Sequence, residues 1–296
     1  MARARGPLRN RLELSAYLLL RTLFRLLPLG LAEAVGRRAG LLYRLLDARR
    51  RRIVRGNLAL AFPERSAAEV DALAREVFAH FGGLAADLLR SETEPVASLL
   101  ARVEVVGFEH ARAAAGSGRG VFFATPHIGS WEWASLVTGA LGIPVTVVAR
   151  PLDNPFLDAR LTAMREKTGC RVVSKRDAAR TLLKTLRSGG LVGILADQRA
   201  RPPDAVVVPF FGRPASTTTS VARFVAKTGA LVLPAVCLRT GPGRYRYVLS
   251  KPFDAMTLPP EEREVEPLTA RLTALVEKQV REAPGQWLWL HDRWRI

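Results

Sequence analysis

The spacing of hydrophobic and polar positions predicts a chain that alternates between strands and helices after about residue 100. Short apolar runs, each followed by a stretch with helical spacing, are typical of buried strands that lead into amphipathic helices. The expected strands cover 103–107, 120–125, 145–148, 171–174, 191–196, 206–211 and 231–238, with 245–249 antiparallel beside the last. The expected helices cover 131–141, 154–167, 178–186 and 219–227, and a final helix ends near residue 281. This alternation predicts an α/β fold with a mixed, mostly parallel central sheet flanked by helices.

The first part of the chain has a different pattern. Residues 15–35 are rich in leucine, but Arg21 and Arg25 interrupt them and Pro28 kinks or ends the helix. Each arginine would cost about 2.5–3.5 kcal/mol at the centre of a bilayer, and the two share one helical face. We therefore expect an interfacial helix, with its arginines among lipid phosphates, in preference to a membrane-spanning one. A soluble amphipathic helix packed on the domain is the alternative.

A basic run, Arg49–Arg52 with Arg55, follows this helix and suits anionic lipid headgroups. No nucleic-acid-binding motif is present and no aromatic residues interleave the arginines, so we do not expect a nucleic-acid partner.

We expect two parts: a basic, membrane-associated helical segment over 1–56 and an α/β domain over 57–296. Ser66 and Glu69 have the spacing of a capping box at the start of a long helix.

Composition adds one constraint on the partner. The chain has 296 residues and a formal net charge of +18, from 45 basic and 27 acidic residues. This excess favours an acidic partner, such as an anionic membrane surface or an acidic protein. Cys170 and Cys237 lack the spacing of a zinc or redox motif, so we expect buried thiols. With no metal-ligand cluster or glycine-rich phosphate loop in the sequence, we expect no cofactor and no metal.

Among the four histidines, only His127 follows a buried strand at a turn into a helix, which is where open α/β sheets usually house their chemistry. Pro126 and Gly129 bracket a sharp bend, and Ser130 is a candidate N-cap. Glu132 can meet His127 only if the histidine is on the turn and the glutamate is in the first helical turn. The spacing predicts a histidine oriented by a carboxylate, with a simple helix-capping contact as the alternative.

Polar side chains also follow other predicted strands. Arg150 ends the strand at 145–148, Asp197 and Gln198 end the strand at 191–196, and Arg213 follows the run at 206–211. The carboxyl ends of parallel strands lie along one edge of a sheet. We therefore expect these residues to converge with His127 on a single site.

Several of these pieces also resemble a known family. They are His127-Ile-Gly-Ser-Trp-Glu132, Ala149-Arg-Pro151, Ala196-Asp-Gln198, Val208-Pro-Phe-Phe-Gly212, Thr217-Thr-Thr219 and the closing Trp287-Leu-Trp-Leu-His-Asp-Arg-Trp294, preceded by Asn57-Leu58 and Phe62-Pro63. In this order they resemble the bacterial lipid A biosynthesis (lauroyl and myristoyl) acyltransferases, within the lysophospholipid acyltransferases that share a His-x4-Asp/Glu motif. Family members usually begin with a membrane-spanning helix, from which the arginine-interrupted N-terminus here departs.

The resemblance implies an O-acyltransferase at the cytoplasmic face of the bacterial inner membrane, peripheral or anchored by one N-terminal span. It implies transfer of a fatty acyl chain from a thioester of acyl carrier protein or of coenzyme A to a hydroxyl of a lipid A precursor. A hydroxyl needs a base with a pKa near 7, which histidine supplies. His127 is the expected general base, and Glu132 is expected to hold its tautomer.

The other site residues receive roles from the same resemblance. The expected oxyanion donors are backbone N–H groups of the turn after His127, or Arg150, which could instead bind an acceptor phosphate. Asp197 would position Arg150 or the acceptor, while Gln198 and Arg213 would contact substrate. Phe210 and Phe211 would line the acyl channel or pack in the core.

Two other functions stay open on the sequence alone. One is transfer to another lipid acceptor, such as a glycerophospholipid or a phosphatidylinositol mannoside, from acyl-CoA. The other is a non-catalytic protein that binds membranes or nucleic acid through its charge. The three tryptophans at 287, 289 and 294 would either anchor at a bilayer interface or pack against the sheet.

Overall fold

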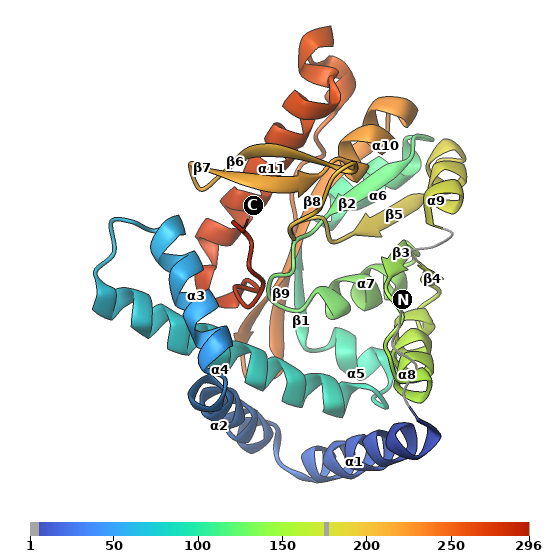
Figure 1. The fold of residues 1–296 in the computed structure, drawn as a ribbon. Coiled ribbons are helices and arrows are strands. Elements are labelled where there is room, and N and C mark those ends of the chain that lie inside the picture. The colour runs from blue at the N-terminus through green and yellow to red at the C-terminus, as the bar shows by residue number, and fades with distance from the viewer. Residues whose placement is uncertain (1–5, 175–177, 296) are drawn as a thin grey trace.

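The computed structural model describes residues 6–174 and 178–295, and it confirms the predicted α/β fold (Figure 1). Within these residues a seven-stranded sheet has the order β1-β9-β8-β2-β5-β3-β4. Neighbouring strands are parallel except β8 and β9, which pair antiparallel as predicted. The strands are β1 (Val103–Val106), β2 (Val121–Ala124), β3 (Thr146–Ala149), β4 (Arg171–Ser174), β5 (Leu191–Ile194), β8 (Leu231–Gly241) and β9 (Arg244–Leu249).

Helices cover both faces of this sheet because alternate residues of its buried strands point to opposite sides. Phe123 of β2 packs in a cluster with Trp133 and Val137, whereas its neighbour Phe122 packs with Leu182 and Val225. The first face carries α5 (Val96–Leu100), α6 (Phe108–Gly116), α7 (Trp131–Ala140) and α8 (Pro155–Glu166). The second carries α9 (Ala178–Arg187), α10 (Ser220–Thr228) and α11 (Val265–Glu282), with short 3-10 turns at Ala255–Thr257, Pro260–Arg263 and Pro284–Gln286.

The N-terminal region forms four further helices, α1 (Pro7–Leu26), α2 (Leu29–Leu46), α3 (Ala48–Ala61) and α4 (Ala67–Ser91). The chain breaks between α1 and α2 at Pro28, where the sequence predicts a kink. Ser66 and Glu69 form the expected capping box at the start of α4. The boundary expected at residue 56 falls inside α3, which runs on without interruption.

Helices α2 and α4 cross with their backbones in contact, because glycines face each other at the crossing. A Cβ atom on Gly40 would lie 2.1 Å from the carbonyl oxygen of Phe78, and one on Gly82 would lie 2.2 Å from that of Gly36. No larger residue fits at these positions without moving one helix. The N-terminal helices are thereby held against α4, which itself packs on the α/β domain.

Arg21 and Arg25 of α1 contact the protein, which corrects the expectation that they lie among lipid phosphates. Arg21 lies 3.5 Å from Glu92, and Arg25 donates a hydrogen bond to Thr93 at 3.3 Å. The opposite side of α1 exposes Leu8, Leu12, Leu19, Leu23 and Leu26. At 100° per residue these five leucines fall within an arc of about 60°.

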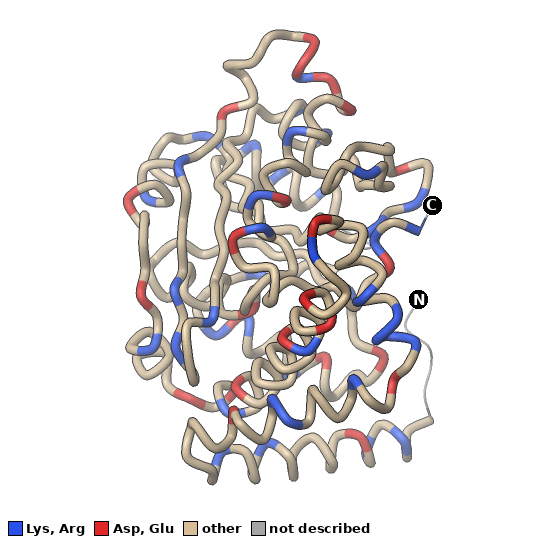
Figure 2. Tube along the Cα trace, turned by 90° about the vertical axis from the view of Figure 1, so that its left-hand side faces the viewer, with Lys and Arg blue, Asp and Glu red and all other residues tan. Residues whose placement is uncertain are grey.

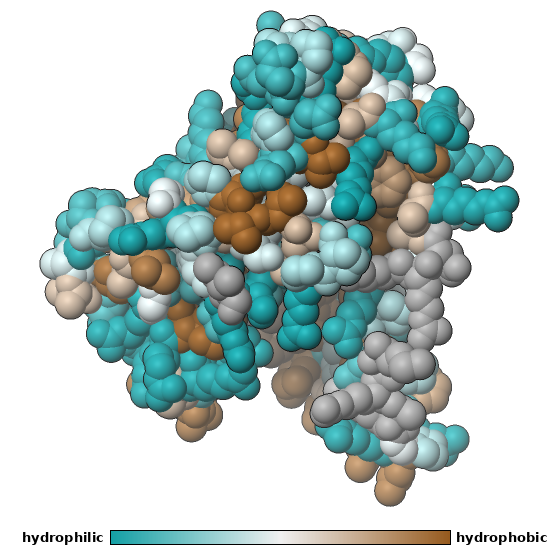
Figure 3. All heavy atoms as spheres, turned by 45° about the horizontal axis from the view of Figure 1, so that its top comes forward, coloured by the Kyte–Doolittle hydropathy of each residue, from teal (hydrophilic) through white to brown (hydrophobic). Residues whose placement is uncertain are grey.

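Helix α2 continues this exposed apolar surface with Leu31, Val35, Leu42, Leu45 and Leu46. We call these residues and the five leucines of α1 the leucine face. Both helices lie at the bottom of the molecule in Figure 1, and hydrophobic side chains project from the lower edge in Figure 3. Among the described residues, no helix combines the length and the apolar character needed to cross a membrane.

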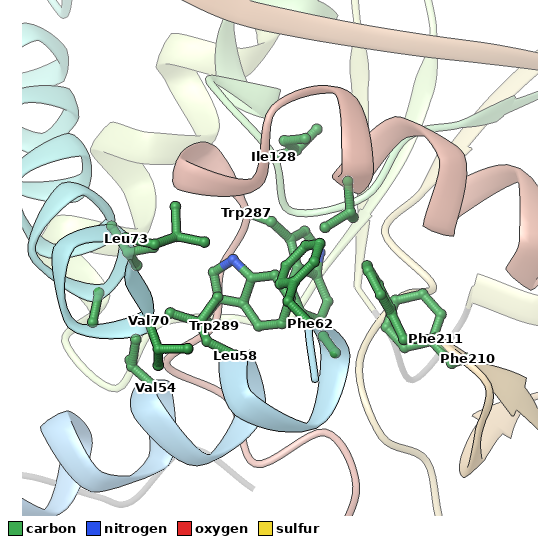
Figure 4. Close-up of a cluster of buried hydrophobic side chains, with 14 of the residues drawn as sticks. Val54, Leu58, Phe62, Val70, Leu73, Ile128, Phe210, Phe211, Trp287 and Trp289 are labelled. Atoms are coloured by element: carbon green, nitrogen blue, oxygen red, sulfur yellow. The ribbon is translucent and has the colours of Figure 1, made fainter. Parts of the chain in front are cut away.

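The segment after β5 forms a hairpin of its own. Strands β6 (Ala205–Phe210) and β7 (Arg213–Thr218) pair antiparallel in a separate two-stranded sheet. The C-terminal tail packs between this hairpin, α3 and α4, where Trp287 and Trp289 are fully buried beside Phe62 and Phe210 (Figure 4). The tail tryptophans therefore belong to the core and are not interfacial anchors.

Candidate active site

His127 lies on the turn between β2 and α7, and this turn is packed tightly onto the edge of β8. Gly129 has a positive φ of 57°, and a Cβ atom there would lie 2.1 Å from the carbonyl oxygen of Cys237. The N–H of Ser130 donates to that same oxygen at 2.8 Å. Only glycine allows this approach, so the bend predicted around Gly129 fixes where the histidine stands.

The backbone N–H groups of the turn are already used within the protein. The N–H of Ile128 donates to the carbonyl of Pro126, that of Gly129 to Gln286 and that of Ser130 to Cys237. The N–H of His127 itself donates to Asp197 at 2.8 Å. Contrary to the expectation, the N–H groups of residues 128–130 are therefore not free to stabilise an oxyanion in this structure. Ser130 stands at the N-cap position of α7, but its side chain makes no capping hydrogen bond.

Asp197 is the carboxylate that faces the imidazole. Its Oδ1 lies 2.6 Å from Nδ1 of His127, and its Oδ2 accepts hydrogen bonds from the His127 N–H and, at 2.7 Å, from the indole N–H of Trp287. The side chain is almost fully buried. Nδ1 donates to the carboxylate in this arrangement, which leaves Nε2 of His127 as the nitrogen able to accept a proton. The structure thus gives Asp197 the contact with His127 that the sequence assigned to Glu132.

Glu132 instead forms a bidentate ion pair with Arg165 of α8. Arg165 donates from Nε to Oε2 at 2.8 Å and from Nη2 to Oε1 at 2.6 Å. Trp131 adds a third hydrogen bond to Oε1 at 3.2 Å. The physical reason for the difference is that Glu132 sits in the first turn of α7, which faces α8, whereas β5 is the strand beside β2 and brings Asp197 to the histidine.

The surrounding charges decide the protonation of His127. Burial opposes the charged imidazolium, but the charge and hydrogen bond of Asp197, helped by the charge of Glu132, outweigh it and raise the pKa of His127. Burial likewise opposes the charge of Asp197, yet His127 and the N–H of Trp287 hold its pKa below the ordinary value. Asp197 is therefore ionised at neutral pH, and His127 gains a proton more readily than a free imidazole.

The other predicted site residues fall into two groups. Gln198 stands beside the histidine, with its Nε2 atom 3.5 Å from Nε2 of His127. Arg150 is exposed at the end of β3, along the same sheet edge as His127 and Asp197. Arg213 does not join them: it is exposed at the turn of the β6–β7 hairpin, outside the seven-stranded sheet, because residues 206–211 form no part of that sheet.

An apolar pocket lies next to the histidine, between α7 and the sheet. Thr125 and Trp131, on either side of His127 in the sequence, both line it, and the ring centroid of Trp131 is 5.1 Å from that of the imidazole. The remaining walls are mainly the side chains of Phe123, Ala134, Val145, Val147, Leu195 and Ala235, together with the backbone of Gly193. Phe210 and Phe211 do not line this pocket; both are buried in the aromatic core around Trp287 and Trp289.

Sequence reasoning did not assign Arg165 or Trp287 to the site. Trp287 lies in the C-terminal tail, which is held beside Asp197 by hydrogen bonds from Asn57 of α3 to the carbonyls of Trp289 and His291 and by backbone hydrogen bonds to the His127 turn. The tryptophans were a visible signal, but nothing in their spacing indicated a carboxylate partner. Within residues 6–174 and 178–295, no group of three or more acidic, histidine or cysteine side chains is arranged to hold a metal ion.

Comparisons with known proteins agree on one family. A family model described as bacterial lipid A biosynthesis acyltransferase matches residues 8–296. The lipid A biosynthesis lauroyltransferase of Escherichia coli is 29% identical over 83% of this chain and 79% of its own. The lipid A biosynthesis palmitoleoyltransferase of the same organism is 26% identical over 91% and 86%. A phosphatidylinositol mannoside acyltransferase of Mycobacterium tuberculosis is 27% identical over 64% of this chain and 58% of its own.

Proposed function

This chain belongs to the bacterial lipid A biosynthesis acyltransferase family and is therefore an O-acyltransferase; we propose that it moves a fatty acyl chain from a thioester to a hydroxyl of a lipid A precursor. The observation that carries the chemistry is the pairing of Nδ1 of His127 with Asp197, which leaves Nε2 to accept a proton, while Thr125 and Trp131 near it in the chain line an apolar pocket. Family membership argues against the non-catalytic alternative, a protein that only binds membranes or nucleic acid.

In the proposed reaction, Nε2 of His127 accepts the proton of the acceptor hydroxyl as its oxygen attacks the thioester carbonyl. The tetrahedral intermediate then collapses, the C–S bond breaks, and the imidazolium returns the proton to the leaving thiolate. Asp197 holds the Nδ1–H tautomer and stabilises the imidazolium, as the acid of a catalytic triad does. The side-chain amide of Gln198 and the guanidinium of Arg150 remain as donors for the oxyanion or for a phosphate of the acceptor.

Direct transfer without an acyl-enzyme agrees with the state of the two cysteines. Cys170 and Cys237 are both buried, and burial raises the pKa of the Cys237 thiol above its ordinary value. A buried thiol with a raised pKa is a poor nucleophile. The hydroxyl brought by the lipid therefore takes the place that a nucleophilic side chain has in a hydrolase.

The pocket beside Trp131 is the proposed site of the acyl chain. Its walls are mostly apolar, and Trp131, one of its lining residues, has its ring centroid 5.1 Å from that of the catalytic histidine, so an acyl chain held there would be attached to a carbonyl near the imidazole. Glu132 and Arg165 line the same pocket as a closed ion pair, so they would shape its entrance without carrying the proton.

The proposed location is the cytoplasmic surface of the bacterial inner membrane, and the leucine face supports a contact with a membrane. A lipid acceptor reaches the site only if the enzyme lies against the bilayer. Exposed leucines on two adjacent helices, with basic residues around them, are typical of a peripheral contact with an anionic membrane. The donor would be acyl carrier protein, an acidic protein that suits a net charge of +18.

Lipid A from a deletion strain tests the proposal. Complementation with the wild-type gene should restore an acyl chain that mass spectrometry detects, whereas His127→Ala should leave lipid A as in the deletion strain, with transfer lowered by at least about 100-fold. Unchanged lipid A in the deletion strain would exclude this acceptor. It would favour the alternative, transfer from acyl-CoA to a glycerophospholipid or a phosphatidylinositol mannoside, which the mycobacterial relative suggests.

A further inference from the structure

Helix α3 has an arginine-lined groove on its outer surface, away from the active site. The groove has a volume of about 650 Å³ and runs between α3 and the turn into α4. Arg51, Arg52, Arg55 and Arg65 line it, over a floor of small residues that includes Gly56 and Ala59. None of the described residues that line it is acidic. Lys and Arg are spread over the whole fold (Figure 2), so the hollow, more than the charge alone, marks this surface.

The arginines differ in what holds them. Arg51 donates to the carbonyls at the end of α2, and the guanidinium of Arg65 lies over the Phe62 ring. Arg55 is half exposed, 3.6 Å from Asp71, and Arg52 is exposed. Arg52 and Arg55 therefore present charge to a partner, while the other two shape the groove.

The length of the groove decides the kind of partner. Ala48 and Ala59 both line it, and at 1.5 Å per residue they are about 16 Å apart along α3. A single phosphate occupies one or two guanidinium groups. Arg51, Arg52 and Arg55 of α3 and Arg65 before α4 line this length above a floor of glycine and alanine. A groove about three helical turns long with basic walls matches a second helix that carries acidic side chains.

The position of α3 indicates that the partner of the groove is a soluble protein and not a lipid surface. The leucine face lies on α1 and α2, and α3 rises away from those helices (Figure 1). Leu60 is the large apolar side chain exposed on α3, with 39% of its surface accessible. The opposite side of α3 holds the C-terminal tail through Asn57, and the tail holds Asp197 through Trp287. A partner in the groove would thus dock on the side of α3 opposite the tail that holds Asp197, and outside the membrane contact.

We propose that the α3 groove is the docking surface for an acidic helix of the protein that carries the acyl donor. This inference rests on the proposed acyl transfer. Docking in this groove would give the excess of basic residues a role in binding the donor. Complementary charge at the edge of an interface mainly accelerates and orients the encounter of two proteins.

The test compares one acyl group on two carriers. Lauroyl-acyl carrier protein and lauroyl-CoA are given to the wild-type enzyme, to Arg52→Glu and to Gly56→Phe. The second variant adds a bulky side chain at the groove, where a Cβ atom on Gly56 has nothing within 4 Å. Both variants should raise KM for the protein-bound donor by at least about tenfold and leave KM for lauroyl-CoA unchanged. Arg187→Glu, an exposed charge on α9, is the matched control and should change neither value.

Three results would overturn the proposal. The variants could leave KM for the protein-bound donor unchanged, raise KM equally for both donors, or weaken only the binding of the enzyme to anionic vesicles. If the wild-type enzyme transfers from neither donor, the proposed function fails first. Direct binding of lauroyl-acyl carrier protein to the wild-type and variant enzymes, measured without turnover, then decides the docking question alone. Equal binding by wild type and Arg52→Glu would refute it.

Discussion

At the scale of single residues, the site depends on the charges around one imidazole. His127 is partly buried beside the ionised Asp197, and Glu132 contributes a second negative charge that Arg165 largely balances. A general base acts only when it is neutral, and here the carboxylates raise the pKa of His127 above its ordinary value. Activity should therefore rise with pH through a pKa higher than that of a free imidazole.

Replacing Asp197 tests this balance. Asp197→Asn removes the charge that raises the pKa of His127, so the acidic limb of the kcat/KM profile should move to lower pH. The amide also fails to hold the productive tautomer, so kcat should fall by about 10²–10⁴-fold. The measurement is the pH dependence of acyl transfer in both enzymes. If the acidic limb of the profile stayed at the same pH in Asp197→Asn, a group other than His127 would be responsible for it.

Glu132 supplies the matched control, because it belongs to a different pair. Glu132→Gln leaves the partly buried Arg165 without its counter-ion, which should destabilise the fold by about 1–3 kcal/mol. The double variant Glu132→Gln/Arg165→Gln removes both charges and should recover much of the stability and activity. If the double variant remained as inactive as Asp197→Asn, Glu132 would be acting on His127 directly, as its spacing in the sequence suggests.

The pocket can be probed at Gly193, where β5 leaves room beside the proposed acyl chain. A Cβ atom there would meet Val145 and Val147 at 3.4 and 3.5 Å, which are ordinary contacts, so Gly193→Val should fold. The added methyl groups would narrow the pocket and shift the preference toward shorter acyl donors by about tenfold in the ratio of kcat/KM values. Competition between donors of different chain length measures this ratio. If the ratio of kcat/KM values did not change, the acyl chain would bind outside this pocket.

At the scale of elements, the sequence predicted what local patterns control. The strands expected at 120–125 and 191–196, the turn at Gly129 and the break at Pro28 all follow from apolar runs, glycine and proline. The structure has the turn and the break where expected and ends the two strands at 124 and 194, within two residues of the prediction. The partner of His127 was not predictable in this way. Asp197 is 70 positions away, and only the order of strands in the sheet makes it a neighbour. The same limit applies to the β6–β7 hairpin and to the C-terminal tail, whose places depend on long-range packing.

The crossing of α2 and α4 gives a prediction at this scale. Gly40→Ala puts a Cβ atom where the carbonyl oxygen of Phe78 lies, so the helices must separate, at a cost of about 1–3 kcal/mol in the free energy of unfolding. Gly56→Ala is the control, since a Cβ atom there meets nothing within 4 Å and alanine stabilises an exposed helix by about 0.5–1 kcal/mol over glycine. Urea unfolding of both variants measures the difference. Equal stability would show that the helices have room to move apart.

At the scale of the whole molecule, the exposed leucines and the active site must be reconciled with a lipid substrate. Deleting residues 1–56 would not test this cleanly, because α2 packs on α4 through Gly36 and Gly40 and its loss would expose the core. Single side chains on the leucine face are better probes. They point outward, while the polar contacts of Arg21 and Arg25 on the other side of α1 hold the helix in place.

The double variant Leu19→Glu/Leu23→Glu should therefore fold normally but bind anionic vesicles at least about tenfold more weakly, because two apolar contacts are lost and two repelled charges are added. Transfer to an acceptor in vesicles should fall with binding, whereas transfer to an acceptor dispersed in detergent should not. Val207→Glu, at an exposed apolar position on β6, is the control and should bind as the wild type does. Vesicle binding that survives in the leucine variant would place the membrane contact on another surface. The acceptor would then have to reach His127 from a different side of the sheet edge.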